Sequence, residues 1–320
     1  AKCRIKGPKA KKFLDNIFAN KHKKKIGRIN LCHALNTKGG VHSEFTIMRE
    51  STDSFYCVSA GAWQRLDHDW IKKHMPEDRS VKFENITNQM GVLVIAGPKS
   101  RELLERVSSD DFSNEAFPWL SGKNIKIGSA ETLAIRVNFV GELGWEIHSP
   151  IEVQNHIFDA LMDAGQNLGI KPFGIRAMDS LRLEKSYKLI GTELSIEYAG
   201  YESGIDRFIH PNKGQFIGRD ALVQWREKGF ENSFVTLEVH GVTDADVLGN
   251  NPIYSNGKVV GRATGGNYGF RVNKSLALAM VSPAQSEVGT KLQIDILGNM
   301  HDVTVIPESP YDPKNDKIRA

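Results

Sequence analysis

A strand, a Gly-Pro-Lys turn and an amphipathic helix occur twice in this chain, about ninety residues apart. The first copy reads CRIKGPKAKKFLDNIF at residues 3–18, and the second reads LVIAGPKSRELLERVS at residues 93–108. After each turn the apolar residues recur at helical spacing, which predicts one buried helix face. Pro8 and Pro98 suit a first helical turn, where the missing N–H costs nothing. Two copies of one strand–helix unit predict a pseudo-duplicated α+β domain.

Other segments of the first 229 residues also have regular patterns. Strand-like runs occur at residues 29–36, 43–50 and 54–61, with a hairpin turn predicted at residues 36–41. Helical spacing predicts helices at residues 66–75, 151–165 and 175–187. Pro76 and Gly165 are the expected ends of the first two helices.

The pattern changes after residue 229. Short strand-like runs alternate with Gly and Asn turns at residues 234–241, 257–266, 275–281 and 291–298. Regular short strands of this kind predict a small all-β barrel or sandwich. We therefore divide the chain into a first domain, residues 1–229, and a β domain, residues 230–320. The Pro- and Asp-rich residues 307–320 are expected to form an extended tail.

Composition and charge place the chain among globular proteins. Of its 320 residues, 40% are hydrophobic and 25% are charged, with a net charge of only +4. Residues 1–28 carry eleven Lys and Arg against one acidic residue, and KHKKK spans residues 21–25. This basic run is either a solvated face or a site for a polyanion. Because no nucleic-acid motif accompanies it, we expect no nucleic-acid partner.

Other features set the compartment. The longest apolar runs, such as residues 90–97, are far shorter than the ~20 residues of a membrane helix. We therefore expect no membrane partner. Cys3, Cys32 and Cys57 have no metal-type spacing, which favours buried thiols in a reducing compartment. The expected location is the cytoplasm, or the mitochondrial matrix in a eukaryote. The chain begins with Ala1, which we interpret as a processed form, a subunit or a fragment.

The stretch VNFVGELGWEIHSP at residues 137–150 places two glutamates, Glu142 and Glu146, around a Gly-Glu-Leu-Gly turn. A surface hairpin with a rim carboxylate would give this pattern. A pocket that binds the donor edge of a flat heterocycle would also give it, because a carboxylate only accepts hydrogen bonds and can take two of them. The glycines Gly141 and Gly144 permit a tight turn and a close approach of the backbone to a ligand.

Six segments of the chain occur in an order that resembles the folate-binding aminomethyltransferase superfamily, which includes the glycine cleavage T-protein. They are FYCVSAGAWQRLDHDWI at 55–71, GVLVIAGPKSRELL at 91–104, GELGWEIHSP at 141–150, AMDSLRLEKSY at 177–187, KGQFIGRDAL at 213–222 and KSLALAMV at 274–281. The resemblance covers almost the whole chain. It is strongest to the C-terminal folate domain of dimethylglycine and sarcosine dehydrogenases, and Met178 stands where T-proteins carry an arginine.

This resemblance implies a fold and a cofactor. The fold would be a three-lobed cloverleaf with a central channel for tetrahydrofolate; residues 1–229 would form two lobes and the β barrel the third. In the demethylating relatives a flavin domain oxidises an N-methyl amine to an iminium. No G-x-G-x-x-G fingerprint opens a strand–helix unit here, so FAD is expected only if a flavoprotein domain or subunit is fused or associated.

The function implied by the resemblance is capture of a methylene group from an oxidised N-methyl amine, of the dimethylglycine or sarcosine type, as 5,10-methylenetetrahydrofolate. Two alternatives stay open. One is direct methyl transfer to tetrahydrofolate by a flavin-free demethylase. The other is a folate-binding module without catalysis.

The resemblance also implies site residues. It assigns pterin binding to Glu146 and not to Glu142. Phe139 stands where relatives often carry a tyrosine, so it can stack on a ring but cannot donate a hydrogen bond. Tyr187 and Tyr268 are placed near the channel.

The predicted catalytic residue is Asp67, whose carboxylate would stabilise a cationic iminium and handle a proton. Its spacing to Trp70 matches the family's essential aspartate, but the alignment needs one inserted residue, so Asp69 is the rival. Asp67 could instead cap the helix that follows it. Arg182 is expected to pair with Asp179 one turn away. The histidines show no metal-ligand spacing, so no metal is expected.

Overall fold

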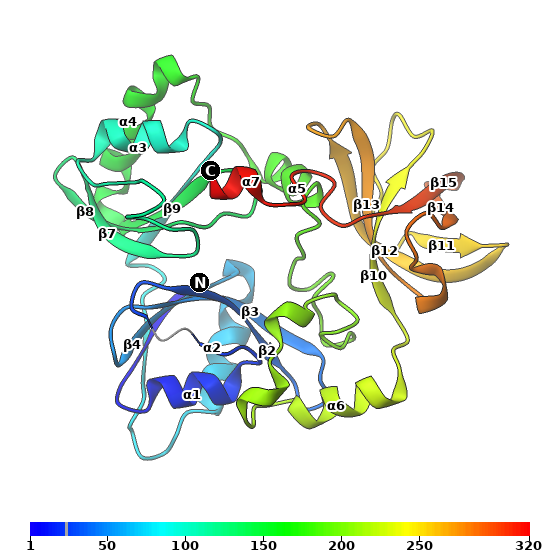
Figure 1. Cartoon of the computed structure of the whole chain (residues 1–320), viewed down its shortest axis with the longest axis horizontal. Coiled ribbons are helices and arrows are strands. Elements are labelled where there is room, and N and C mark those ends of the chain that lie inside the picture. Colours follow the sequence, from blue (N-terminus) through cyan, green and yellow to red (C-terminus); the bar gives the residue numbers. More distant parts are fainter. Residues whose placement is uncertain (23–24) are drawn as a thin grey trace. The chain divides into compact units, whose positions relative to one another are not determined.

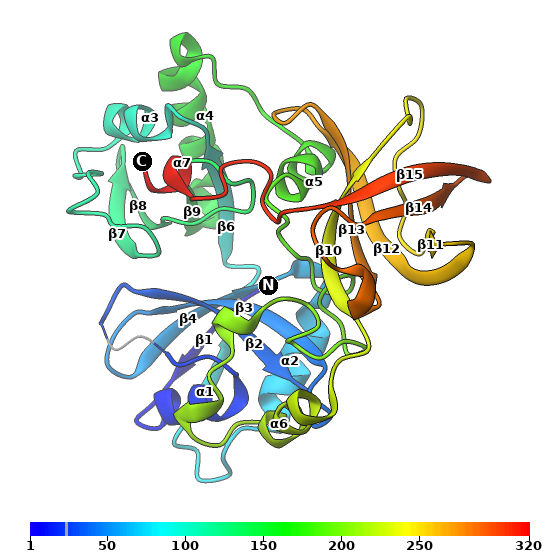
Figure 2. The same ribbon diagram turned by 45° about the vertical axis from the view of Figure 1, so that its right-hand side comes forward.

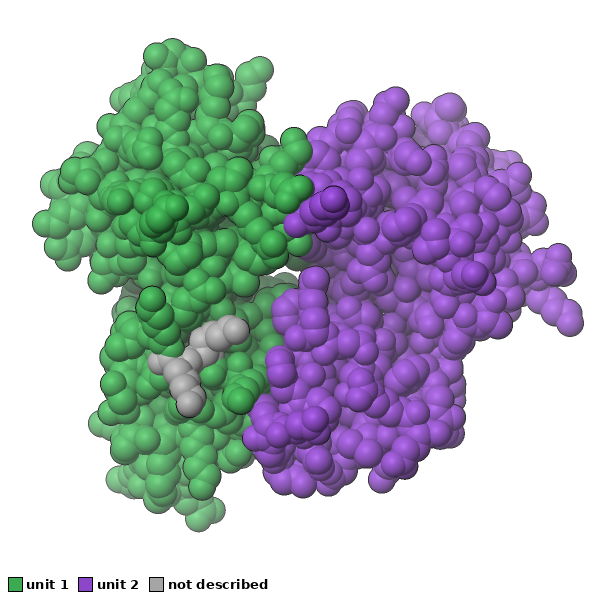
Figure 3. All heavy atoms as spheres, in the orientation of Figure 1, with its two compact units in different colours: residues 1–32, 44–173, 315–320 green, residues 33–43, 174–314 purple. Residues whose placement is uncertain are grey.

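The computed structural model describes residues 1–22 and 25–320 in two compact units (Figures 1 and 3). Unit 1 comprises residues 1–32, 44–173 and 315–320, and unit 2 comprises residues 33–43 and 174–314. Lys23 and Lys24 of the basic run lie outside the described residues. No helix among the described residues is long and apolar enough to cross a bilayer.

The first sheet has five strands in the order β2-β3-β4-β1-β5. They are β1 (Lys2–Lys6), β2 (Ile29–Leu35), β3 (Val41–Arg49), β4 (Ser54–Ser59) and β5 (Lys82–Asn85). Helices α1 (Ala10–Ile17) and α2 (Gln64–Lys73) lie beside this sheet (Figure 1). Cys3 pairs with Cys57 across β1 and β4, and all three cysteines are buried as predicted.

The second sheet, also in unit 1, has four strands in the order β6-β9-β8-β7. They are β6 (Met90–Ala96), β7 (Gly122–Ile127), β8 (Ala130–Ile135) and β9 (Gly144–Pro150). Helices α3 (Ser100–Val107) and α4 (Gln154–Gly165) pack together against it (Figure 2). Trp145, Leu104 and Ile157 are fully buried between the helices and the sheet, so this face of β9 is the core face.

The predicted repeat is confirmed, since β1–α1 and β6–α3 are the same strand–turn–helix unit. Gly7 and Gly97 take positive φ angles of 128° and 134°, which favour glycine. The prolines Pro8 and Pro98 were expected in the first helical turn, but the helices begin at Ala10 and Ser100. Each proline lies instead in the turn that the glycine carbonyl closes with the first helical N–H.

Unit 2 contains helices α5 (Ile175–Leu183) and α6 (Arg219–Lys228) and a closed six-stranded barrel, as predicted for the β-rich segment. The barrel order is β10-β13-β12-β11-β14-β15. Its strands are β10 (Ser233–Val239), β11 (Pro252–Ser255), β12 (Lys258–Gly269), β13 (Lys274–Val281), β14 (Lys291–Ile296) and β15 (Asn299–Ile306). Helix α5 packs against β12 and β13 (Figures 1 and 2).

Two expectations about chain segments were wrong. The helix expected over residues 175–187 ends at Leu183, because the Arg182 carbonyl accepts the N–H groups of Lys185 and Tyr187 and Ser186 adopts a positive φ of 53°. The tail is not extended throughout. It ends in the short helix α7 (Asp316–Arg319), whose Ile318 is buried, so apolar burial orders it.

Candidate functional site

Glu146 lies on the face of β9 opposite to the buried Trp145. In the sheet register its neighbours are Val94 on β6 and Ile135 on β8. The Glu146 side chain is 22% exposed and Val94 is 44% exposed, whereas Ile135 is fully buried, so this face is open on its β6 side only. A carboxylate on a half-open apolar strand face is available to a ligand.

A chain of two hydrogen bonds links Glu146 to the first sheet. The Nε2 atom of His148 lies 3.0 Å from Oε2 of Glu146, and Nδ1 of His148 lies 3.0 Å from the hydroxyl of Tyr56 on β4. His148 and Tyr56 are both fully buried. The two sheets of unit 1 also share an apolar cluster that includes Tyr56, Leu133 and Ile135. The position of the Glu146 carboxylate therefore depends on how the two sheets pack.

Chemistry sets the direction of these hydrogen bonds. An ionised carboxylate only accepts, so Nε2 of His148 carries the proton toward Glu146. Burial raises the pKa of the Tyr56 phenol, which therefore keeps its proton. In the neutral ring, Nδ1 of His148 is then the acceptor for the Tyr56 hydroxyl. Each of the two hydrogen bonds therefore joins one donor to one acceptor. Tyr56 donates to His148, and His148 donates to Glu146.

Only one of the two Glu146 oxygens is used in this chain of hydrogen bonds. Oε2 accepts from His148, and Oε1 accepts no hydrogen bond from the residues that the structure describes. A carboxylate with an unused oxygen on a partly open face can accept N–H donors from a bound molecule.

The turn before β9 is built by Asn138. Its Oδ1 atom accepts the N–H groups of Val140 and Gly141, and its Nδ2 atom donates to the carbonyl of Glu142 at 2.7 Å. Gly141 has a positive φ of 74°. A Cβ atom at Gly144 would lie 2.3 Å from the carbonyl oxygen of Ile95. The sequence requirement for glycine at both positions follows from this backbone geometry.

Phe139 lies in the same turn and is partly buried. The segment 137–143 is irregular, and the strand itself begins at Gly144. Phe139 and Glu146 are thus placed by one turn and the strand that follows it.

Asp67 and Asp69 lie in α2 with opposite exposure. Asp67 is 2% exposed, whereas the Asp69 side chain is 67% exposed and lies 3.9 Å from Arg65 in a surface ion pair. The helix was expected to begin near Asp67, but a 3₁₀ turn at Gly61–Trp63 leads into α2 at Gln64. Asp67 is therefore inside the first helical turn and is not the N-cap residue. A buried carboxylate there gains from the helix dipole.

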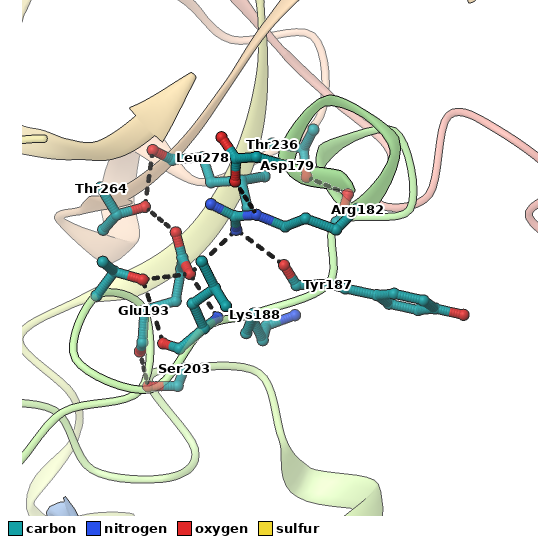
Figure 4. A network of polar contacts seen from close by, with 12 residues as sticks. Asp179, Arg182, Tyr187, Lys188, Glu193, Ser203, Thr236, Thr264 and Leu278 are labelled. Atoms are coloured by element: carbon teal, nitrogen blue, oxygen red, sulfur yellow. Dashed lines mark hydrogen bonds and ion pairs between the residues drawn. The ribbon is translucent and has the colours of Figure 1, made fainter. Parts of the chain in front are cut away.

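Tyr187 belongs to unit 2 and follows a buried polar network (Figure 4). Arg182 donates to the Tyr187 carbonyl at 2.9 Å and, as predicted, to Asp179 at 2.8 Å. It also contacts the fully buried Glu193 at 3.3 Å. Glu193 accepts the Leu189 N–H at 2.8 Å. Arg182 and Glu193 therefore hold the backbone at Tyr187 and Leu189, and the Tyr187 ring points away from them in Figure 4.

Tyr268 lies on β12 and is 36% exposed. Its hydroxyl donates to Asn273, and its ring packs edge-on against Phe270 at 5.0 Å between centroids. Its carbonyl accepts the Ser180 hydroxyl of α5 at 2.6 Å. Tyr268 thus stands on the α5 side of the barrel.

Of the predicted site residues, Asp67, Phe139 and Glu146 belong to unit 1, and Tyr187 and Tyr268 belong to unit 2. Sequence reasoning missed His148 and Tyr56. Strand alternation was the available signal, because residues 146 and 148 must share a face. No group of His, Cys, Asp and Glu side chains among the described residues could hold a metal ion.

A cavity of about 260 Å³ lies in unit 2, and its lining includes none of the predicted site residues. Its lining comprises Gly191, Thr192, Ser195, Glu197, Tyr198, Gly249, Asn250, Arg262, Ala263 and Thr264. The Arg262 guanidinium is already engaged, because it donates to Tyr198, Asn250 and Glu197. Internal pairing of its main charge makes this cavity a poor anion site.

Models of known families match most of the chain. Residues 1–213 match the GCVT N-terminal domain, and residues 232–312 match the glycine cleavage T-protein C-terminal barrel domain. The first match alone covers more than half of the chain.

Individual proteins give the same result. Human mitochondrial dimethylglycine dehydrogenase is 37% identical over 309 residues, which are 96% of this chain and 36% of that protein. The aminomethyltransferase of Thermoanaerobacter sp. (strain X514) is 29% identical over 308 residues, 96% of this chain and 83% of that protein. The chain thus spans about a third of the length of the dehydrogenase.

The solved structure of the glycine cleavage system aminomethyltransferase T from Bartonella henselae superposes with a TM-score of 0.87. The alignment covers 98% of this chain and 84% of that one at 20% identity. At this identity the likeness shows the fold alone. It confirms the predicted aminomethyltransferase fold, together with the closed C-terminal barrel.

Proposed function

The chain belongs to the glycine cleavage T-protein family of aminomethyltransferases, which are enzymes, and on that premise we propose that it transfers a one-carbon unit to tetrahydrofolate. The donor is the iminium formed when an N-methyl amine of the dimethylglycine or sarcosine type is oxidised. The product is 5,10-methylenetetrahydrofolate. Human dimethylglycine dehydrogenase, at 37% identity, supports this class of amine.

The observation that carries the proposal is that only one carboxylate oxygen of Glu146, Oε2, accepts a hydrogen bond within the protein's described residues. A pterin ring presents an amide N–H and an amino group along one edge. Glu146 offers an unpaired oxygen on a partly open strand face, while a buried imidazole holds its other oxygen. This donor and acceptor match supports tetrahydrofolate as the ligand. Bound tetrahydrofolate supplies the nitrogen atoms that accept the one-carbon unit.

Asp67 is the proposed catalytic carboxylate. Its 2% exposure limits solvent screening, so its charge stabilises a nearby cation more strongly than an exposed carboxylate does. The Asp69 side chain is 67% exposed, so solvent screens its charge, which supports Asp67 over Asp69. In this proposal Asp67 stabilises the iminium charge and accepts a proton released from the folate nitrogens as they bond to the carbon, while the bond from that carbon to the donor nitrogen breaks and the demethylated amine leaves.

The aromatic residues Phe139, Tyr187 and Tyr268 are proposed to border the folate site. Phe139 presents a ring without a hydroxyl, so it stacks and does not donate. The network around Arg182 and Glu193 holds the Tyr187 backbone, which supports a positioned ring at that point.

The oxidation step is proposed to take place outside this chain. The chain spans about a third of the dimethylglycine dehydrogenase that it matches. We place the flavin in a domain or subunit that accompanies residues 1–320 and passes on the iminium. Absorbance near the flavin wavelengths in the protein isolated with its partner tests this arrangement.

The catalytic proposal is tested with Asp67→Asn and the matched control Asp69→Asn. N-(hydroxymethyl)sarcosine loses water to give the required iminium, and formation of 5,10-methylenetetrahydrofolate is followed after subtraction of the uncatalysed rate. Loss of Asp67 should lower the catalysed rate by about 100-fold or more, whereas loss of Asp69 should change it by less than about twofold.

The outcomes separate the possible functions. Unchanged turnover in Asp67→Asn removes Asp67 from the mechanism. A wild-type protein that binds folinic acid but produces no catalysed rate is a folate-binding module. A wild-type protein that does not bind folinic acid contradicts the proposed function.

A further inference from the structure

We propose that His148 is a positioning residue that holds the Glu146 carboxylate ready for a ligand, and that Tyr56 anchors the His148 ring through its other nitrogen. The inference rests on the proposed function, because the ligand of Glu146 is taken to be a reduced folate. From the sequence, the only expectation for the histidines was that they bind no metal.

The contacts of His148 favour a positioning role over simple core packing. Both ring nitrogens are engaged at 3.0 Å, and the side chain is fully buried. The Tyr56 and His148 rings meet edge to face, with centroids 5.4 Å apart and an interplanar angle of 89°. A ring held from one side by a buried phenol has a fixed direction, so the hydrogen bond on its other side is fixed too.

The effect on Glu146 follows from its exposure. A glutamate side chain has several rotamers, and the 22% exposed Glu146 has room to leave the strand face. The hydrogen bond from His148 removes that freedom before the ligand arrives. Binding then costs less side-chain entropy, which is the usual gain from preorganisation.

The direction of the hydrogen bonds also sets what Glu146 can accept. With Nε2 of His148 donating to Oε2, the oxygen Oε1 is left for the ligand. Tyr56 donates a hydrogen bond to Nδ1, the acceptor in this tautomer, and so anchors the ring from that side. Without the phenol, Nδ1 is a buried acceptor with no partner, and the ring loses its anchor on that side.

Two substitutions of His148 separate its two contacts. In His148→Gln the amide nitrogen reaches about the position of Nε2, so the donor to Glu146 is kept. In His148→Asn the amide reaches only about as far as Nδ1, so the contact with Tyr56 is kept and that with Glu146 is lost. Folinic acid binding is measured by titration calorimetry, and folding is checked by thermal unfolding.

The expected result is a split between the two variants. His148→Asn should bind folinic acid about tenfold more weakly than wild type, the usual effect of losing one hydrogen bond to a charged group. His148→Gln should recover most of that loss. Equal affinity in wild type and His148→Asn, or equal loss in both variants, would overturn the inference.

A double-mutant cycle tests whether His148 acts through Glu146. In the Glu146→Ala background, His148→Asn should cause no further loss of affinity. Losses that multiply would show that His148 acts independently. If His148→Asn does not fold, Tyr56→Phe carries the test, because phenylalanine keeps the ring packing; it should weaken binding about threefold or more, and unchanged binding contradicts the proposal.

Failure of this inference is distinguishable from failure of the proposed function. If wild type does not bind folinic acid, the proposed function fails. If wild type binds and Glu146→Gln weakens binding while the His148 and Tyr56 variants bind as wild type does, only the positioning role fails.

Discussion

Two glutamates four positions apart differ in how the fold places their side chains. Glu146 lies on a strand, next to an exposed Val94, with one carboxylate oxygen held by a buried imidazole. Glu142 lies in the preceding turn, where Asn138 holds its backbone carbonyl. The first arrangement fixes the Glu146 carboxylate in one direction on a partly open face.

Replacing Glu146 by glutamine should therefore weaken folinic acid binding. The glutamine oxygen accepts from His148, which turns the amide NH₂ toward the donors of the pterin. The mismatch should cost about 2 kcal/mol, or about 30-fold in affinity, measured by titration calorimetry. Glu142→Gln is the matched control and should bind within about twofold of wild type. Equal losses in the two variants would contradict the assignment.

For single residues, the sequence predicted which side chain belongs to the site but not which side chains it contacts. The order of six segments pointed to Glu146 and not to Glu142. Alternation along β9 puts residues 146 and 148 on one face, a signal that the prediction of the site from sequence did not use. No local pattern predicts that a residue from β4, ninety-two positions away, meets the His148 ring. Such contacts depend on how two sheets pack, which a pattern along one strand does not contain.

The turn from residue 137 to residue 143 is tightly constrained. The Asn138 side chain accepts two backbone N–H groups of the turn and donates to the Glu142 carbonyl. At the end of the turn, Gly144 lies against the Ile95 carbonyl. The turn therefore sets where β9 begins and how Glu146 is aimed.

Gly144→Ala should disturb both the fold and the site. A Cβ atom 2.3 Å from a backbone oxygen forces the strands apart, at a cost of about 2 kcal/mol in the free energy of unfolding. Folinic acid binding should weaken in parallel. Gly61→Ala is the control for stability, because no atom lies within 4 Å of its added Cβ. Chemical denaturation compares the two, and similar free energies of unfolding would contradict this reading.

The second prediction at the scale of the elements concerns the buried polar network of Figure 4. Glu193→Ala leaves the buried Arg182 without its buried partner and should lower the free energy of unfolding by about 3 kcal/mol. Glu197→Ala removes an exposed partner of Arg262 and should cost less than about 1 kcal/mol. The free energies of unfolding are measured with urea. Equal losses in the two variants would show that the network contributes no more than a surface ion pair.

Helix and strand positions were largely predictable, and their ends were not. The repeated strand–helix unit and the barrel followed from periodicity, which reports burial. The start of α2 and the early end of α5 did not follow from it. They depend on the 3₁₀ turn at Gly61–Trp63 and on the positive φ of Ser186, neither of which leaves a periodic signal.

For the whole molecule, the aminomethyltransferase fold is shown by the family matches and by a TM-score of 0.87. The division of the chain at residues 229 and 230 stays a prediction. The compact units do not coincide with the predicted domains. Residues 33–43 belong to the same unit as residues 174–314, and residues 315–320 belong to unit 1. Segments far apart in the sequence complete each unit, which reading along the chain does not predict.

The central claim is that Glu146 binds the pterin of a reduced folate, and a crystal structure with folinic acid tests it most directly. We expect the pterin amide N–H and amino group to lie within about 3 Å of the Glu146 carboxylate oxygens, with His148 still donating to Oε2. A pterin bound elsewhere, with the Glu146 side chain turned into solvent, would contradict the account.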